Sequence, residues 1–117
     1  MDRTNPATGE SLEPIPDDDS EDVEVALDRA TEAFAEWKDV PIRKRQQLLE
    51  NAADVLREDE DEFAELMTRE MGKTLASARS EVQKCAWVCD YYAENAADFL
   101  QTERRPGPAH AETTVSY

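Results

Sequence analysis

Apolar residues recur at intervals of three and four along most of the chain, a spacing typical of one face of an amphipathic helix. In residues 20–37 the apolar stripe consists of Val23, Leu27, Ala30, Phe34 and Trp37. Ser20 stands before this stripe as the expected N-cap residue, followed by Glu21 and Asp22, whose negative charges favour a helix N-terminus. The pattern therefore predicts a first helix that begins at Ser20.

Two shorter helices are predicted next. The second begins near Pro41, a residue that suits a first helical turn. Its apolar face comprises Ile42, Leu48, Leu49, Ala52, Val55 and Leu56. The third covers about 60–71, with Phe63, Leu66, Met67 and Met71 facing inward. Gly72 is expected to end this helix in the left-handed conformation, which glycine adopts without steric cost.

The fourth predicted helix has the most regular pattern and runs from about Thr74 to Leu100. Its apolar positions alternate steps of three and four without a break: Leu75, Ala78, Val82, Cys85, Cys89, Tyr92, Ala96 and Phe99. At 1.5 Å per residue it would be ~40 Å long. Because that is long for a domain of this size, we expect it to pack against more protein than three short helices supply.

Neither end of the chain has a helical pattern. Residues 1–19 contain the turn signature Asn5–Glu10 and are expected to form an extended arm or short hairpin, with Asp17–Asp19 as a solvated loop. After Arg104, the residues Pro106, Gly107 and Pro108 exclude a helix. Alternation in Ala111–Tyr117 then predicts a strand that no later strand pairs with, leaving an open edge.

These elements predict a mostly α fold of four helices, with a short N-terminal hairpin or arm and a C-terminal strand. The chain divides into an arm (1–19), a four-helix segment (20–101) and a linker with a strand (102–117). There are 117 residues, of which 39% are hydrophobic and 35% are charged. Such a length suits one small domain with a modest core.

The net charge of −15 repels phosphates and anionic lipids, which excludes nucleic acid and membrane surfaces as partners. No apolar run approaches the ~20 residues of a membrane span, and Met1–Glu13 lacks a signal pattern, so a cytoplasmic protein is expected. Lysine occurs only at Lys38, Lys44, Lys73 and Lys84. An acidic, lysine-poor surface suits a high-salt cytoplasm, where salt screens self-repulsion; an ordinary acidic protein is the alternative.

Cys85 and Cys89 lie four residues apart and could form a metal or redox pair. Zinc requires about four ligands, and the single histidine, His110, is distant in the sequence. A catalytic thiolate needs an activating histidine or a helix N-terminus, which a mid-helix cysteine lacks. Two free cysteines buried in a helix seam are therefore the preferred interpretation.

Two other motifs are also better explained by structure than by chemistry. Met71-Gly72-Lys73-Thr74 resembles the end of a phosphate-binding loop, but the position of the earlier glycine is Met67 and the preceding segment is helical. Phe34, Trp37 and Trp87 could form an aromatic ligand box but are more typical of core anchors; Trp87 lies beside the apolar seam, where it could contact another domain. We assign no catalytic, cofactor-binding or metal-binding residue.

Several motifs in this order resemble the opening segment of the aldehyde dehydrogenase superfamily. They are Asn5–Glu10, Ala33-Phe34, Trp37, Pro41, Arg45, Leu48-Leu49, Ala52, Leu56, Glu70–Lys73, Glu81-Val82, Lys84–Cys89 and Tyr91–Glu94. Glu70–Lys73 and Lys84–Trp87 look closest to succinate-semialdehyde dehydrogenase-like members. The resemblance runs from about Asn5 to Tyr117, and the order and spacing of the motifs carry it.

The resemblance implies a family activity, the oxidation of an aldehyde to an acid with NAD or NADP. In the family a cysteine thiolate attacks the carbonyl, hydride passes to the nicotinamide, and a glutamate activates water. The family places all of these parts downstream of the segment seen here. Cys85 and Cys89 do not match the catalytic position, so we expect this chain alone to bind no cofactor and to be inactive.

The resemblance also implies a layout and partners. The four helices would cover the α/β cofactor-binding domain, with the fourth helix near the substrate entrance. The Ala111–Tyr117 strand would begin the β-structure through which family members form homo-oligomers. Three readings follow: a fragment of an enzyme, a subunit that completes a partner chain carrying the rest of the aldehyde dehydrogenase, or an independent helical interaction module.

Overall fold

The computed structural model describes residues 1–106 and 112–116 and confirms the predicted mostly α fold. The helices are α1 (Ser20–Trp37), α2 (Ile42–Glu58), α3 (Glu60–Met71) and α4 (Leu75–Phe99). The strands are β1 (Arg3–Thr4), β2 (Ser11–Leu12), β3 (Glu103–Pro106) and β4 (Glu112–Val115). As predicted, β1 and β2 form an antiparallel hairpin, in which Arg3 is opposite Leu12.

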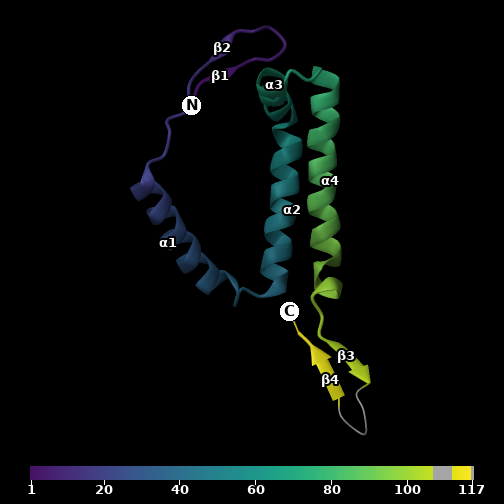
Figure 1. Ribbon diagram of the computed structural model, residues 1–117. Coiled ribbons are helices and arrows are strands. Elements are labelled where there is room, and N and C mark those ends of the chain that lie inside the picture. The colour runs from purple at the N-terminus through teal and green to yellow at the C-terminus, as the bar shows by residue number, and fades with distance from the viewer. Residues whose placement is uncertain (107–111, 117) are drawn as a thin grey trace.

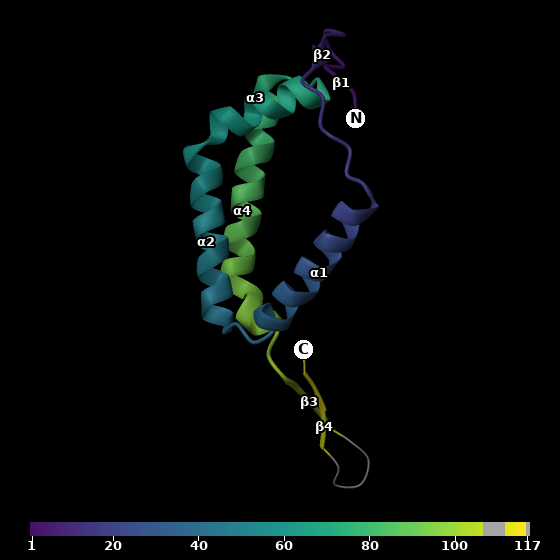
Figure 2. The same ribbon diagram turned by 90° about the vertical axis from the view of Figure 1, so that its left-hand side faces the viewer.

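Helices α2, α3 and α4 form the packed body of the molecule. α2 and α4 lie side by side in opposite directions, and α3 crosses one end of the pair (Figures 1 and 2). The buried residues are mostly alanines, which let helices approach closely: Ala53, Ala64, Ala78, Val82, Ala86 and Ala93. Across the pair, Gln46 Nε2 donates a hydrogen bond to the Ala93 carbonyl oxygen at 2.6 Å. Alanines and one valine make a thin core, which contributes little hydrophobic stabilisation.

The α3–α4 junction is fastened to the N-terminal hairpin. Gly72 ends α3 with φ of 68°, as predicted. An added Cβ at Gly72 would lie 3.0 Å from Pro6 Cγ and 3.3 Å from the Ala7 nitrogen. Arg3 of β1 forms an ion pair with Glu70. The hairpin turn therefore packs directly on the glycine that separates the two helices.

Replacing Gly72 by alanine should destabilise the chain by about 2 kcal/mol, roughly half from the left-handed backbone and half from the clash with the hairpin. Gly9→Ala is the matched control, because Gly9 also has a positive φ, of 77°, but has no atom within 4 Å of its Cβ position. We expect it to lose only the backbone part. The urea concentration at which half of the helical circular dichroism signal is lost compares the two variants; equal shifts would show that the hairpin does not pack on Gly72.

The N-cap of the first helix is not Ser20 but Asp19, one residue earlier. Asp19 Oδ1 accepts hydrogen bonds from the backbone nitrogens of Glu21 and Asp22, at 2.8 and 3.0 Å. The Asp22 carboxylate accepts one from the Asp19 nitrogen at 3.0 Å, which completes a capping box. A carboxylate satisfies these donors and the helix dipole better than a hydroxyl group, which explains the shift. The fourth helix occupies its predicted range, with Thr74 and Leu100 as its caps.

The predicted C-terminal strand is present as β4, but the expectation that it has no partner was wrong. β4 pairs with β3 in an antiparallel hairpin, in which Glu103 is opposite Val115 and Arg104 is opposite Thr114. The partner was missed because β3 is short and charged and ends at a proline, a composition tolerated at a sheet edge but unlike a typical strand. Ala111, Tyr117, Gly107, Pro108 and His110, on which parts of the prediction rest, lie outside the described residues.

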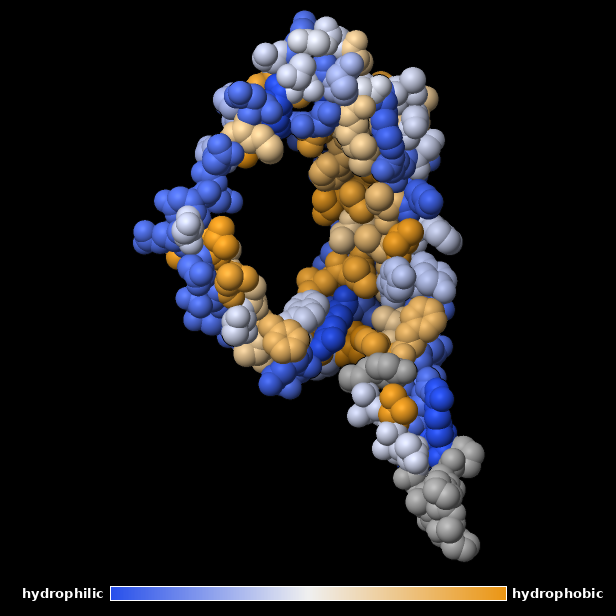
Figure 3. Space-filling view, in the orientation of Figure 1, coloured by the Kyte–Doolittle hydropathy of each residue, from blue (hydrophilic) through white to orange (hydrophobic). Residues whose placement is uncertain are grey.

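The molecule is open rather than compact. Helix α1 stands apart from the α2–α3–α4 body and leaves an opening between them (Figures 1 and 3). The radius of gyration is 20.7 Å, whereas a compact domain of this length has about 13 Å. The accessible surface is 9533 Å², against about 6,400 Å² for a compact monomer of this mass. The excess surface is of the size that a large protein interface would cover.

Candidate functional site

The apolar stripe of α1 is exposed along its whole length. Val23, Leu27, Phe34 and Trp37 have exposed fractions of 50%, 57%, 65% and 44%, and no residue of α1 is buried. In the space-filling view, hydrophobic residues gather on the sides of α1 and of the helical body that face the opening (Figure 3). The helix was predicted correctly, but none of the side chains on its apolar face is buried by the described residues.

Helix α4 has two apolar sides, of which one is covered. Ala78, Val82, Ala86 and Ala93 are buried in the helical body. The predicted inward positions Cys85, Tyr92 and Phe99 are instead exposed, and Cys89 is partly buried. The expectation of two cysteines buried in a seam is therefore wrong for Cys85. The spacing of three and four did not distinguish the buried face of α4 from the exposed apolar face beside it. A helix that is apolar on both sides has no polar side that would show which face is buried.

Similar exposed positions occur on the two shorter helices. Leu48 and Val55 of α2 are 51% and 48% exposed, and Leu66 and Met71 of α3 are 52% and 57% exposed. All four were predicted to face inward. Burial of a large apolar side chain stabilises a protein by about 1.5–3 kcal/mol, so these exposed side chains forgo a large contribution to stability. An apolar surface of this extent marks an interaction site.

We call two parts of this surface the docking surface. It consists of exposed or partly exposed side chains that lie on one side of each helix: Val23, Leu27, Phe34 and Trp37 on α1, with Cys85, Val88, Cys89, Tyr92 and Phe99 on α4. On α4 it includes a groove lined by Ser80, Glu81, Lys84, Cys85, Val88 and Cys89.

The aromatic residues do not form a ligand box. Trp87, 60% exposed, contacts Tyr91 with ring centroids 5.9 Å apart, and Tyr92 and Phe99 lie 6.5 Å apart. In the part of the chain that the structure describes, neither Phe34 nor Trp37 has a ring contact with Trp87. The alternative interpretation of these three residues as core anchors fails too, since all are exposed. Trp87 thus lies free to contact another domain, as its sequence position indicated.

No metal-binding cluster forms within the described ranges. There, no group of three or more His, Cys, Asp or Glu side chains converges, and Cys85 and Cys89 are free thiols. His110 lies outside these ranges.

The described residues also do not fit a dinucleotide. Phosphate binding in such sites needs a glycine that leaves its backbone open after a parallel strand. Gly72 follows a helix and is covered by Pro6 and Ala7, which agrees with rejecting residues 71–74 as a phosphate loop. Lys73 is engaged in an ion pair with Glu81. The described sheets are both two-stranded and antiparallel.

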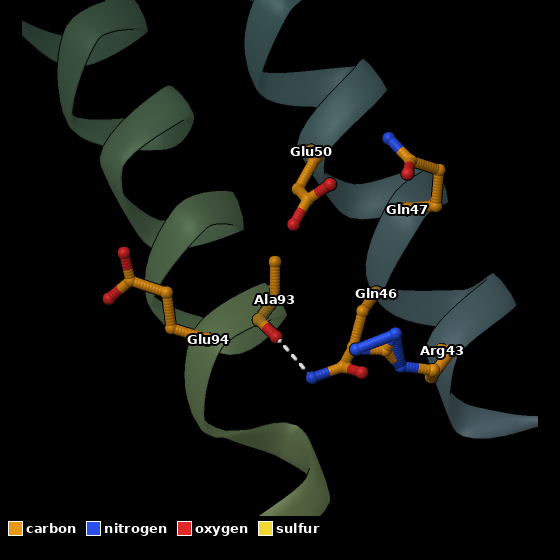
Figure 4. Close-up of a pocket in the computed structure, with 6 residues that line it drawn as sticks. All are labelled: Arg43, Gln46, Gln47, Glu50, Ala93 and Glu94. Atoms are coloured by element: carbon orange, nitrogen blue, oxygen red, sulfur yellow. Dashed lines mark hydrogen bonds between the residues drawn. The ribbon is translucent and has the colours of Figure 1, made fainter.

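A polar hollow between α2 and α4 is the remaining candidate for a small-molecule site (Figure 4). It is lined by Arg43, Gln46, Gln47, Glu50, Ala93 and Glu94. The Gln46 amide already donates a hydrogen bond to the Ala93 carbonyl. The charged lining residues are Arg43, Glu50 and Glu94, and this mixture of charges favours neither an anionic nor a cationic ligand. The hollow contains no nucleophile with an activating base. No sequence motif indicated this hollow, and the Gln46–Ala93 hydrogen bond within it joins α2 to α4.

Arg57 and Asp90 form an ion pair that joins α2 to α4. The hydrogen bond to the Asp90 carboxylate raises the pKa of Arg57 above its ordinary value. The guanidinium therefore stays charged, and the partly exposed pair links the two helices at the surface. No helix in the described ranges combines the length and apolar character needed to cross a bilayer.

Comparison with known proteins gives a consistent picture. The aldehyde dehydrogenase family model matches residues 1–117. A Synechocystis sp. protein named probable succinate-semialdehyde dehydrogenase (NADP+) is 42% identical over 99 residues, and the Escherichia coli succinate semialdehyde dehydrogenase (NAD(P)+) Sad is 41% identical over 99 residues. Each alignment covers 85% of this chain but only 22% and 21% of the relative.

A solved structure agrees. The crystal structure of succinic semialdehyde dehydrogenase from Streptococcus pyogenes, in complex with NADP+, matches with a TM-score of 0.86 and 31% identity. The match covers 92% of this chain and 24% of that one. The open arrangement of helices seen here is thus also found as part of a much larger folded chain.

Proposed function

Because the chain belongs to the aldehyde dehydrogenase family, we propose that it supplies the N-terminal helical part of an aldehyde dehydrogenase and works only together with the rest of that fold. The exposed docking surface carries this proposal. Its apolar side chains, with the surface excess over a compact monomer, match a segment whose neighbours belong to another part of the fold.

The assembled enzyme is proposed to oxidise succinate semialdehyde with NADP or NAD. The support is that two relatives are named as succinate-semialdehyde dehydrogenases, one with NADP+ and one with NAD(P)+. The cofactor and the reacting groups are assigned to the remainder of the fold, since the described residues of this chain offer no dinucleotide site. This chain would contact that remainder through the apolar docking surface on α1 and α4.

The remainder can lie on the same polypeptide or on a separate subunit, and both arrangements use the same docking surface. An independent helical module is less well supported, because such a module needs a closed core. Among the described residues the largest fully buried side chain is Val82, and α1 contributes no buried residue.

We also propose that the β3–β4 hairpin belongs to the β-structure through which the assembled enzyme forms homo-oligomers. The hairpin projects away from the helical body, at the far end of α4 (Figures 1 and 2). The hairpin is a two-stranded antiparallel sheet, and pairing at the edge of such a sheet is a common route to association.

Complementation in two chains tests the proposed function. The 117-residue chain is mixed, in molar KCl to screen its charge, with the part of the E. coli relative that follows the matched segment. We expect NADP-dependent oxidation of succinate semialdehyde by the mixture and none by either chain alone. The relative's own matched segment serves as the positive control. If that segment restores activity and this chain does not, or if this chain alone turns over the aldehyde, the proposal is wrong.

A further inference from the structure

The direction of α1 depends on very few contacts. No residue of α1 is buried, and within the described ranges α1 has no extensive packing against the other helices. Its C-terminal end turns through residues 38–41 directly into α2. An isolated helix on a four-residue connection would swing, and a swinging α1 would not hold its apolar stripe toward the opening.

The side chain of Arg45 in α2 binds the C-terminal end of α1. The Arg45 guanidinium donates hydrogen bonds to three backbone carbonyls: Nη2 to Trp37 at 2.8 Å and to Lys38 at 2.9 Å, and Nε to Val40 at 3.0 Å. The same guanidinium lies over the Trp37 ring, 5.4 Å from its centroid. Arg45 thereby supplies a positive charge to a C-terminus that has no basic residue in its own last turn.

The position of Arg45 in α2 indicates a tertiary role. It lies in the first turn of α2, beside Arg43 and Lys44, and that turn contains no acidic residue. Cations at a helix N-terminus oppose the helix dipole. The arginine at this position therefore does not serve α2 itself, and the three carbonyls of the preceding segment account for it.

We propose that Arg45 is a positioning residue, which fixes the direction of α1 relative to α2 and keeps the α1 stripe facing the opening before the rest of the fold docks. Its use in docking rests on the proposed function, whereas the coupling of α1 to α2 is a property of this chain alone. A planar guanidinium with several donors can hold three carbonyls and a ring at once, which a lysine ammonium cannot.

Distances between spin labels test the coupling in the full chain. One label is placed on α1 by Glu32→Cys and the other on the native Cys85 of α4, with Cys89→Ala. We expect a narrow distance distribution with Arg45 present and broad distributions in Arg45→Met and Arg45→Lys. Lys44→Met is the matched control, because it removes the same charge from the neighbouring residue. The Lys44 side chain has no hydrogen bond or ion pair with any described residue, so this variant should keep the narrow distribution.

A second label pair separates positioning from general loss of structure. Labels at Glu58→Cys on α2 and at Cys85 on α4 should give the same distances with and without Arg45→Met, and the helix content should not change. A distribution for α1 that is equally narrow in Arg45→Met, or already broad in the unaltered chain, would overturn the proposal.

Complementation then links the coupling to docking. The apparent Kd rises by the inverse of the fraction of chains with α1 in the docking direction. We expect about a tenfold rise for Arg45→Met, equivalent to 1.4 kcal/mol, and none for Lys44→Met. If the unaltered chain fails to complement, the proposed function fails while the label distances still decide the role of Arg45. If Arg45→Met complements as well as the unaltered chain, its docking role is excluded.

Discussion

Leu27→Asp should abolish complementation, whereas Val25→Asp should have little effect. Both residues are exposed on α1, at 57% and 43%. Leu27 lies in the stripe that faces the opening; Val25 is two residues away, close to the opposite side of the helix. A carboxylate buried without a partner costs about 3–5 kcal/mol, which is a rise in Kd of roughly 150- to 4,000-fold.

The two variants provide an internal control, because they make nearly the same chemical change on the same helix. Both side chains are exposed in the chain alone, so the helix content of the isolated variants should be equal. Titration of the complementing segment, followed by aldehyde oxidation, gives the two Kd values. Equal values would mean that the α1 stripe is not part of an interface.

The thiols of α4 should be strongly protected on assembly. Cys85 is exposed and Cys89 is partly exposed on the docking surface, so both should react with an aromatic disulfide reagent in the isolated chain. When the complementing segment is present at 100 times its Kd, the reaction should slow about 100-fold, because only free chain reacts. The cysteines of the complementing segment are replaced beforehand, since binding rather than turnover is measured.

A cysteine introduced by Val25→Cys, with Cys85 and Cys89 changed to alanine, serves as the comparison. It lies away from the docking surface and should keep its reactivity in the assembly. Cys85 that reacts at the same rate with and without the complementing segment would show that this face of α4 stays uncovered.

The helices could be predicted from the sequence, but the sides that they bury could not. The spacing of apolar residues by three and four is a local property of the sequence, and it located all four helices. The role of Gly72 at the end of α3 is also local and was predicted from the residue type. Which apolar side of α4 meets α2 is decided by fit: small residues such as Ala86 and Ala93 allow close approach, and the larger Tyr92 and Phe99 do not. Periodicity carries no information about that choice.

The candidate site was not predicted from a motif but from the length of the fourth helix relative to the size of the chain. The length of the fourth helix indicated that more protein was needed than the chain supplies, and the exposed face of that helix agrees. The hydrogen bonds from Arg45 to the end of α1 were not predicted. Its partners are backbone carbonyls in a turn, and no sequence pattern identifies which carbonyls lack a donor. The β3 strand was missed for a related reason, since a short charged edge strand has no apolar alternation.

The central claim is that these helices hold their apolar faces open for a neighbour. Small-angle X-ray scattering of the isolated monomeric chain in molar KCl, combined with a thermal melt, tests it most directly. We expect a radius of gyration near the 20.7 Å of the structure and a broad, weakly cooperative melt. A radius of about 13 Å with a sharp two-state melt would contradict it, because the chain would then close its own core.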